Sequence, residues 1–522
     1  MNAFLQPLGN ATTSDLFSSV STSFSRVPGS AIIARYIRSS YQDDPVRSAV
    51  ELFLFLFALR YIISPRYGVR GGKKGGGKVE LRDDEIEDLV EEWTPEPLVG
   101  ELTEAELSEE KSRVVIVGQT GPKVKLSTGK TVTNLASLNF YNFVGSEILK
   151  ERAIHTLRTY GVGPCGPPGF YGHQDVHIKT EHDVATHLGT AACIIYAQAF
   201  STISSVIPAF SKRGDIIVAD KAVNYSIRRG LQISRSQIKW FEHNDMKDLE
   251  RVLKEVVKNT PKKAPLTRRF IVTEALFEST GDVIDLPKIV DLKFQYKFRL
   301  ILDESLSYGT LGLTGRGITE AQNVDSKNID MIVGSLSGPL CGGGGFCAGS
   351  NEVVVHQRIN AASYCFSAAL PALLATTASE TIALLQTEEG AALMDQAREL
   401  SRLMRAQLDP RSEWLKVMSK EDSPYIIAVL KNEAIEAKKW SHADQEAIMQ
   451  DIVDDCLNKG VLITKIKRMP SAQGASVKDL AKEWQPQPAL KICVVVGLTK
   501  KELESAGREI RHAAKRVINA RK

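Results

Sequence analysis

Short apolar runs bounded by polar residues recur along the chain after about residue 110. They cover residues 112–117, 215–220, 269–274, 299–304 and 330–335. Each run is continuous rather than alternating and too short for a buried helix, which is typical of a parallel strand covered on both faces. Between the runs, residues 246–257 and 286–296 carry apolar side chains at helical spacing. Strands that alternate with helices predict an α/β fold with a mainly parallel sheet.

The domain boundaries follow from the same pattern. We expect a large α/β domain over residues 111–399 and a smaller C-terminal α/β domain over residues 400–522. Ligands in open α/β sheets bind beyond the carboxyl ends of the strands. The runs end in polar residues, namely Asp220, Glu274, Asp303 and Ser335. A site at that edge of the sheet is therefore expected.

A longer apolar run, SAVELFLFLFALRYIIS, covers residues 48–64. Its length and apolar character predict a transmembrane helix. A cleaved signal peptide would start nearer the N-terminus, a core helix would rarely hold so many phenylalanines, and an in-plane amphipathic helix would show a polar face. Three nearby basic residues precede it and six follow it: Arg35, Arg38, Arg47, then Arg66, Arg70, Lys73, Lys74, Lys78 and Arg82. This asymmetry predicts a cytosolic C-terminal body and a luminal N-terminal tail over residues 1–47, with Asn10 as a possible glycosylation acceptor.

Residues 65–110 are expected to form a connecting arm. The segment GVRGGKKGGGK at 68–78 is a flexible basic linker, either a solvated spacer or a contact to anionic membrane lipids. An acidic stretch follows over residues 82–93, with Ile86, Leu89 and Val90 at helical spacing. This spacing predicts a short amphipathic helix.

Composition adds two exclusions. The formal net charge of +4 gives no argument for a nucleic-acid partner. No CxxC pair occurs among the cysteines, which are Cys165, Cys193, Cys341, Cys347, Cys365, Cys456 and Cys493. Neither a disulfide framework nor a zinc site is expected, and the pattern favours a reducing compartment.

A series of motifs in fixed order resembles the α-oxoamine synthases, over roughly two-thirds of the chain. The segments are YNFVG from Tyr141, YGVG from Tyr160 with Gly166 and Gly169, the stretch after Asp220, Thr273-Glu274 with Gly281-Asp282, ILDE from Ile301, Arg316-Gly317, and GSLSGPLCGGGGFCAG over 334–349. The resemblance implies the fold-type I architecture of pyridoxal-phosphate transferases. It also implies condensation of an amino acid with an acyl-CoA and loss of carbon dioxide.

The chain departs from that family where the cofactor is held. Gly338 stands at the position of the imine-forming lysine, and no lysine occurs between Asp330 and Ser350. Asn224 and Leu306 stand at the positions of the stacking and the supporting histidine. Asp303 alone is retained. Because glycine cannot form an imine and leucine cannot donate a hydrogen bond, the chain alone is expected to be inactive.

Several segments resemble the lysine-lacking subunits of the eukaryotic serine palmitoyltransferases, a branch of that family, and their form is similar to fungal members. They are YGVGPCGPPGFYGHQDVH from Tyr160, KRGDIIVAD from Lys212, WFEHNDM from Trp240 and YCFSAALP from Tyr364. The resemblance implies a heterodimer at the endoplasmic reticulum membrane, in which a lysine-bearing partner binds pyridoxal 5'-phosphate and forms 3-ketodihydrosphinganine from L-serine and palmitoyl-CoA. Small activating and Orm-type regulatory membrane subunits would be further partners.

In such a dimer, this chain would complete the partner's active site. The candidate contributors are Tyr160, Cys165, Phe366 and Ser367, although the family's threonine in the second segment is Ala368 here. Three other interpretations stay open: an active homodimer that uses another lysine, a scaffold or regulator that touches no substrate, and an unrelated α/β membrane protein.

Some single features have plainer explanations. Asp303 at a strand end could cap the next turn. Gly342–Gly345 lacks the lysine of a phosphate loop and is expected to be closely packed backbone. His173 and His177 have metal-ligand spacing, but no further ligand stands near them in the sequence, so ordinary polar roles are expected.

Overall fold

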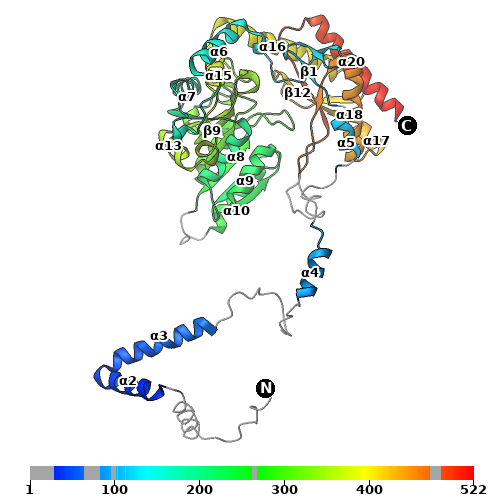
Figure 1. The fold of residues 1–522 in the computed structure, drawn as a ribbon. Helices are drawn as coiled ribbons and strands as arrows, with labels where there is room; N and C mark the ends of the chain where they lie inside the picture. Colours follow the sequence, from blue (N-terminus) through cyan, green and yellow to red (C-terminus); the bar gives the residue numbers. More distant parts are fainter. Residues whose placement is uncertain are drawn as a thin grey trace. The chain divides into compact units, whose positions relative to one another are not determined.

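The computed structural model describes residues 29–63, 83–95, 102, 104–111, 113–260, 267–470 and 484–521. The chain divides into two compact units, Met1–Leu102 and Thr103–Lys522 (Figure 1). Asn10 and the basic linker at 68–78 lie outside the described residues.

The first unit contains three described helices: α2 (Ser30–Asp43), α3 (Pro45–Ile63) and α4 (Asp83–Glu92). α4 forms where the short amphipathic helix is expected. α3 covers most of the expected membrane span, but the span itself is not supported: among the described helices, none combines the length and apolar character needed to cross a membrane. The 19 residues of α3 include Arg47, Glu51 and Arg60. These charges leave an uninterrupted apolar stretch only over residues 52–59, roughly 12 Å of helix against a hydrocarbon layer of about 30 Å.

The second unit is built on a seven-stranded sheet in the order β4-β10-β9-β8-β7-β5-β6. The neighbours from β9 to β6 are parallel, and β10 is antiparallel to both β9 and β4. The mainly parallel α/β sheet is therefore confirmed. Its strands are β4 (Ala192–Tyr196), β5 (Ile216–Asp220), β6 (Gln237–Phe241), β7 (Arg269–Glu274), β8 (Arg299–Asp303), β9 (Met331–Ser335) and β10 (Gly345–Gly349).

Helices cover this sheet, and α15 packs on both α6 and α7 (Figure 1). α10 shows why they form: it buries Leu249, Val252, Leu253 and Val256 at helical spacing, and the Asp245 side chain accepts from two backbone N–H groups at its start. The helices are α6 (Glu147–Tyr160), α7 (Asp175–Leu188), α8 (Ala199–Phe210), α9 (Tyr225–Ser234), α10 (Met246–Asn259), α11 (Leu286–Tyr296), α12 (Ile318–Ala321), α13 (Asn351–Asn360), α14 (Ala362–Cys365) and α15 (Ala372–Leu385), with single 3-10 turns η1 (Phe143–Gly145), η2 (Pro168–Phe170), η3 (Ser326–Asn328) and η4 (Gly338–Leu340).

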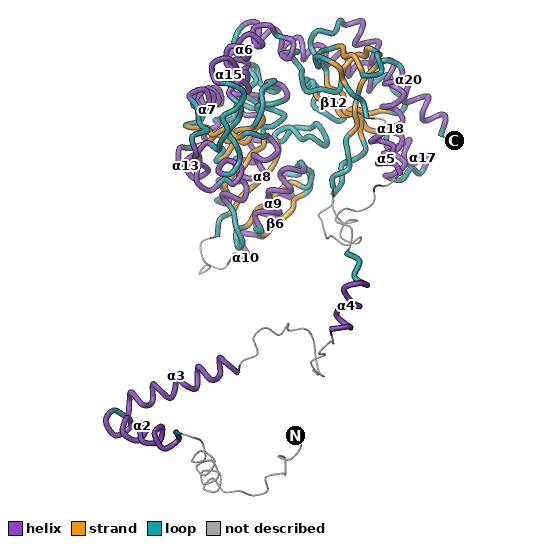
Figure 2. The backbone as a smooth tube through the Cα atoms, in the orientation of Figure 1, coloured by secondary structure: helices purple, strands orange, loops and turns teal. Residues whose placement is uncertain are grey.

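Two four-stranded sheets complete the unit, in the orders β1-β2-β3-β13 and β11-β12-β15-β14 (Figure 2). The strands are β1 (Ile116–Val117), β2 (Lys123–Leu126), β3 (Thr131–Asn134), β11 (Leu415–Val417), β12 (Tyr425–Leu430), β13 (Val461–Leu462), β14 (Thr464–Lys465) and β15 (Ala489–Cys493). The expected strand at 112–117 is thus shorter and lies outside the large sheet. It pairs with the exposed edge of β2, so its residues are not covered on both faces.

The remaining described helices are α5 (Glu104–Lys111), α16 (Glu388–Leu408), α17 (Asn432–Lys438), α18 (His442–Asn458) and α20 (Lys500–Ala520). α16 runs across the expected boundary at residue 400. Its first half places Met394 and Ala397 in the core of the large sheet. Its second half places Leu400 and Met404 in a separate core. The two cores therefore meet along one continuous helix.

Candidate functional site

The polar strand ends meet at one edge of the large sheet, as expected. β5, β7, β8 and β9 are consecutive parallel neighbours. Their last residues are Asp220, Glu274, Asp303 and Ser335. Asp303 pairs in register with Glu274, and Ser335 hydrogen-bonds locally, with its hydroxyl 2.7 Å from that of Ser337. The carboxylates at this edge belong to two separate hydrogen-bonded clusters.

The first cluster surrounds Asp303, which is 3% exposed. The Ser305 backbone N–H donates to Oδ1 at 2.8 Å, and Nδ2 of Asn224 donates to Oδ2 at 2.9 Å. Burial raises the pKa of Asp303, and these donors oppose the rise. Both carboxylate oxygens are thus satisfied by the chain itself. The short-range bond to Ser305 is the turn-capping contact that was considered for this aspartate.

Asn224 is held in place by the helix it begins. Its Oδ1 accepts from the Ile227 backbone N–H at 3.0 Å and caps α9, which directs the amide nitrogen toward Asp303. The Asn224 backbone N–H donates to Oε1 of Glu274 at 2.5 Å. Burial, followed by the charge of Asp303, raises the pKa of Glu274 well above its usual range. The position of the stacking histidine is therefore occupied by an amide that links a helix start to two acidic strand ends.

Gly338 begins η4 with a φ of 68°. A β-carbon at this residue would lie 3.4 Å from the side chain of Leu138. Pro339 follows directly, and proline further restricts the backbone of the residue before it. A side chain at this position would therefore meet an unfavourable backbone, while its β-carbon would make ordinary contact with Leu138. Leu306 is half-buried and packs against the core of the large sheet.

The glycine run after Gly338 is closely packed, as expected. A β-carbon at Gly342 would lie 2.9 Å from the backbone oxygen of Leu336, and one at Gly344 would overlap that of Tyr196. A β-carbon at Gly343 would lie 2.7 Å from the side chain of Leu374. These glycines let backbone segments approach each other rather than line a phosphate site.

These residues do not fit a covalently held pyridoxal phosphate. The imine needs a side-chain amine, and Gly338 has none. Asp303 is the one retained group that could pair with a pyridine nitrogen, and one of its carboxylate oxygens already accepts from the amide of Asn224. Leu306 has no hydrogen-bonding group for the cofactor's oxygen. The edge of the sheet therefore has the family's geometry without its cofactor chemistry.

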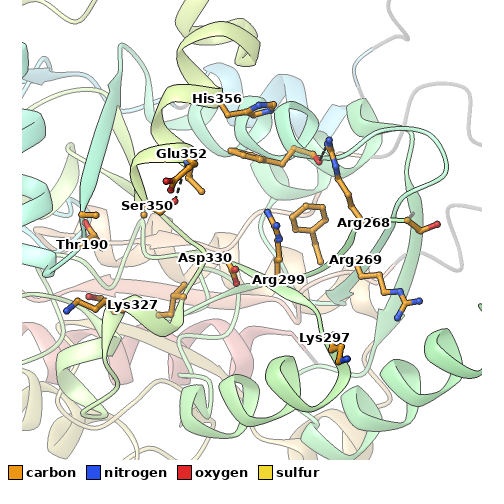
Figure 3. Close-up of a pocket in the computed structure, with 18 of the residues that line it drawn as sticks. Thr190, Arg268, Arg269, Lys297, Arg299, Lys327, Asp330, Ser350, Glu352 and His356 are labelled. Atoms are coloured by element: carbon orange, nitrogen blue, oxygen red, sulfur yellow. Dashed lines mark hydrogen bonds between the residues drawn. The ribbon is translucent and has the colours of Figure 1, made fainter. Parts of the chain in front are cut away.

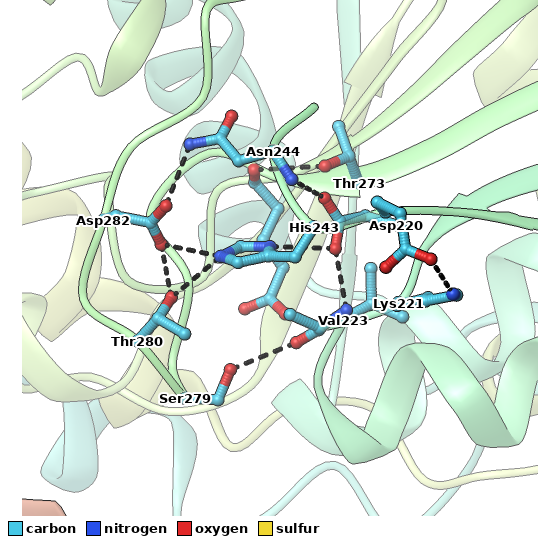
Figure 4. Close-up of polar contacts among 12 residues, drawn as sticks. Asp220, Lys221, Val223, His243, Asn244, Thr273, Ser279, Thr280 and Asp282 are labelled. Atoms are coloured by element: carbon cyan, nitrogen blue, oxygen red, sulfur yellow. Dashed lines mark hydrogen bonds and ion pairs between the residues drawn. The ribbon is translucent and has the colours of Figure 1, made fainter. Parts of the chain in front are cut away.

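The second cluster centres on His243, after β6 (Figure 4). Its Nδ1 lies 3.0 Å from Oδ1 of Asp220, and its Nε2 lies 3.2 Å from Oδ1 of Asp282. Asn244 bonds both carboxylates, with its backbone N–H to Asp220 at 2.8 Å and its Nδ2 to Asp282 at 2.9 Å. Burial lowers the pKa of His243, but the bonds to the two aspartates outweigh it and raise the pKa to about 10. An imidazolium therefore joins the ends of β5 and β6 to the segment after β7.

Sequence reasoning missed this cluster. His243 stands within WFEHNDM and Asp282 within the Gly281-Asp282 pair, so both were quoted only as parts of motifs. Since the three charged residues come from separate segments, their proximity depends on the sheet order. The alternation of strands carries no signal for it.

The two segments with candidate contributors lie side by side. The backbone N–H of Ala369 donates to the carbonyl of Gly166 at 2.9 Å and ties the segments together. Cys165 is exposed with a φ of 57°, and Phe366 is 85% exposed. Both segments therefore present side chains to solvent from one place on the surface. The other candidates behave as follows: the Tyr160 hydroxyl donates to Asp175 at 3.0 Å, and the Ser367 hydroxyl donates to the Ala368 carbonyl at 3.4 Å.

The contacts of His173 and His177 lie within the protein framework. Nδ1 of His177 accepts from the Gln174 backbone N–H at 2.9 Å, and Nε2 lies 2.6 Å from the Leu370 carbonyl. Burial, and then the neighbouring His177, lower the pKa of His173 to about 4. His177 fixes the start of α7 to the segment before α15.

The family model for aminotransferases of class I and II matches residues 130–510. The chain is 35% identical over 526 residues to serine palmitoyltransferase 1 of Saccharomyces cerevisiae, covering 94% of this chain and 92% of the relative. It is 36% identical over 425 residues to serine palmitoyltransferase 1 of Dictyostelium discoideum, covering 81% and 85%. It is 34% identical over 441 residues to long chain base biosynthesis protein 1 of Arabidopsis thaliana, covering 84% and 87%.

Solved structures agree in fold. Sphingomonas wittichii serine palmitoyltransferase superposes with a TM-score of 0.66 at 20% identity, covering 79% of this chain and 96% of that one. An 8-amino-7-oxononanoate synthase from Francisella tularensis gives a TM-score of 0.57 at 18% identity, covering 75% and 99%. The fold-type I architecture with a smaller domain, expected from the motifs, is confirmed. The chain belongs to the serine palmitoyltransferase 1 family, whose plant members are named long chain base biosynthesis protein 1.

Proposed function

We propose that this chain is the non-catalytic but required subunit of a serine palmitoyltransferase heterodimer. A lysine-bearing partner holds pyridoxal 5'-phosphate and condenses L-serine with palmitoyl-CoA to 3-ketodihydrosphinganine, the first step of sphingolipid synthesis. This chain stabilises the partner and completes its active site. The observation that carries the proposal is the state of the cofactor position: Gly338 offers no amine, and the amide of Asn224 stands where a stacking ring would be and bonds Asp303.

A role for the two joined segments follows from their exposure. Large apolar side chains that stay in solvent mark an interaction surface. Phe366 is accompanied by Val162, Phe170 and Tyr171 in the paired segment, with exposed fractions of 81%, 69% and 102% for these three. A partner that covers them brings Cys165 and Phe366 into a shared interface. This supports a partner interface that includes both segments.

The first experiment is affinity purification of the full chain from its native membranes, with identification of what accompanies it. A homologue that carries the lysine is expected in equal amount. The purified chain alone, mixed with pyridoxal phosphate, is expected to show no imine absorbance. Such an absorbance would instead support the active homodimer.

The second experiment separates the site-completing role from a scaffold. Phe366→Ala and Cys165→Ser are made in the heterodimer, with Leu313→Ala as control because Leu313 is 73% exposed and lies outside both segments. We expect the heterodimer to form in all three cases. Turnover or the choice of amino acid should change in the first two, with turnover falling on the order of tenfold if geometry at the site is disturbed. Unchanged turnover and amino-acid choice would support the scaffold.

The proposed location is the endoplasmic reticulum membrane, with the unit from Thr103 to Lys522 on the cytosolic side. A long acyl chain and a lipid-like product both partition into bilayers, so a site beside the membrane suits the reaction. Small activating and Orm-type regulatory membrane subunits are further proposed partners. Protease protection of sealed microsomes tests the location, because a cytosolic body is digested without detergent.

A further inference from the structure

A large basic cavity lies at the opposite edge of the seven-stranded sheet from the cofactor position (Figure 3). Its volume is about 1150 Å³. Arg269 and Arg299 are the first residues of β7 and β8, and Asp330 directly precedes β9. β10 runs the other way, so its last residue, Gly349, pairs with the first residue of β9 at this edge. The cavity is therefore built by the amino ends of the parallel strands.

The charge of the lining is strongly positive. Its cationic side chains are Arg268, Arg269, Lys297, Arg299 and Lys327. It also contains two carboxylates, of which Asp330 is paired with the buried amine of Lys293 and accepts from the Leu300 backbone N–H at 2.8 Å. Glu352 alone is left to offset five cations. Figure 3 shows Arg299 between Asp330 and Arg268.

Several of these cations have no counter-charge. Within the described part of the chain, neither Lys297 nor Arg299 nor Arg269 has an ion-pair partner. The Nε of Arg269 is buried and has no hydrogen-bond acceptor among the described residues. A buried donor without an acceptor costs free energy, and grouped cations repel one another. An anion in the cavity would remove both costs.

We propose that this cavity binds a phosphate ester. Guanidinium groups match the geometry of phosphate oxygens and bind them in pairs. Phe210, Ile329 and Val353 add apolar wall beside the cations, which suits an organic group attached to the phosphate. The volume exceeds what one phosphate needs and lies somewhat above the usual range for small-molecule sites. The phosphate belongs either to a soluble metabolite or to a lipid headgroup, since the chemistry is shared.

The test uses phenyl phosphate as a soluble probe, titrated calorimetrically into the full chain in its purified complex, with phenol as the matched ligand without phosphate. Arg299→Gln and Lys297→Asn each remove one cation. Asparagine suits position 297 because its φ is 59°. Arg508→Gln is the control, since Arg508 is exposed on α20, outside the cavity lining. Thermal unfolding of each variant verifies that it is folded.

We expect saturable binding of phenyl phosphate but not of phenol, weakened roughly tenfold by Arg299→Gln and less by Lys297→Asn. The control should bind like the unchanged chain. Flotation with phosphatidylcholine vesicles, with or without phosphatidic acid, covers the lipid source. Binding that prefers phosphatidic acid and is lost in Arg299→Gln assigns the site to a headgroup. If neither probe binds, or if Arg508→Gln weakens binding as much as Arg299→Gln, the proposal is overturned.

Discussion

Substitution His243→Gln would remove the positive charge that lies between Asp220 and Asp282. Glutamine has a similar length and an amide nitrogen that can donate. It carries no charge, and it lacks the two opposed ring nitrogens with which His243 bonds both carboxylates. The Asp220 side chain is only 1% exposed, so it would lose its counter-charge in a place that water hardly reaches. We therefore expect a large loss of stability whose size depends on pH.

The size follows from the pKa of His243, which rises from 6.5 to about 10 on folding. A raised histidine pKa stabilises the folded state fully below pH 6.5, and the contribution is lost as pH rises to about 10. Each pH unit in this window corresponds to about 1.4 kcal/mol. The imidazolium thus contributes on the order of 5 kcal/mol at its fullest. This agrees with the roughly 3–5 kcal/mol lost when one member of a buried ion pair is removed.

The assay is urea unfolding of the full chain at about pH 6.5 and about pH 9.5, two values that span most of this window. Trp484 reports locally because its ring centre lies 6.5 Å from that of His243. His512→Gln is the control, since His512 is exposed on α20. The unchanged chain should lose much more stability between the two pH values than His243→Gln does. Parallel pH dependence in both proteins would refute the reasoning.

Other predictions concern single residues, each checked by urea unfolding. Asn224→Ala removes both the cap of α9 and a donor to Asp303, and should cost about 2–3 kcal/mol, whereas a surface asparagine would cost little. Gly344→Ala should cost about 3 kcal/mol, because its β-carbon overlaps a backbone oxygen of β4 and its φ is 80°; Gly460→Ala, with a φ of 89° but open space, should show the conformational part alone. Burial raises the pKa of Glu304 to about 7, so the folded state favours its protonated form; stability should fall as pH rises from 4.5 to about 7, and less so in Glu304→Gln.

The pattern of apolar runs was sufficient to predict the large sheet. The expected strand at 269–274 and helix at 286–296 coincide with β7 and α11, and the strand that ends at Asp220 is within one residue. These elements are covered on both faces or carry a clear helical stripe, so burial dictates their composition. The run at 112–117 carries the same composition but forms only a two-residue strand in a separate sheet. The composition of a short apolar run does not predict which strand it pairs with.

The candidate site could be predicted only in part. The absent lysine and histidines are visible as residue types, and the strand order places Glu274 beside Asp303. The bond from Asn224 to Asp303 and the left-handed backbone at Gly338 are properties of geometry, so residue types alone do not show them. The basic cavity was not predicted at all. Its cations come from the starts of β7 and β8 and from the loops and turns beside them, and these segments meet only through the sheet order.

The backbone at Gly338 bears on how readily this protein could accommodate an amine at that position. Placing lysine there takes a change of one residue, but the new side chain would stand on a left-handed backbone before Pro339, which strains any residue that has a β-carbon. A histidine would also have to replace Asn224, which would break the cap of α9. Each step alone lowers stability before any benefit appears. An amine at position 338 combined with a histidine at position 224 would therefore carry a stability cost at both positions, so such a variant would need compensating changes elsewhere in the fold.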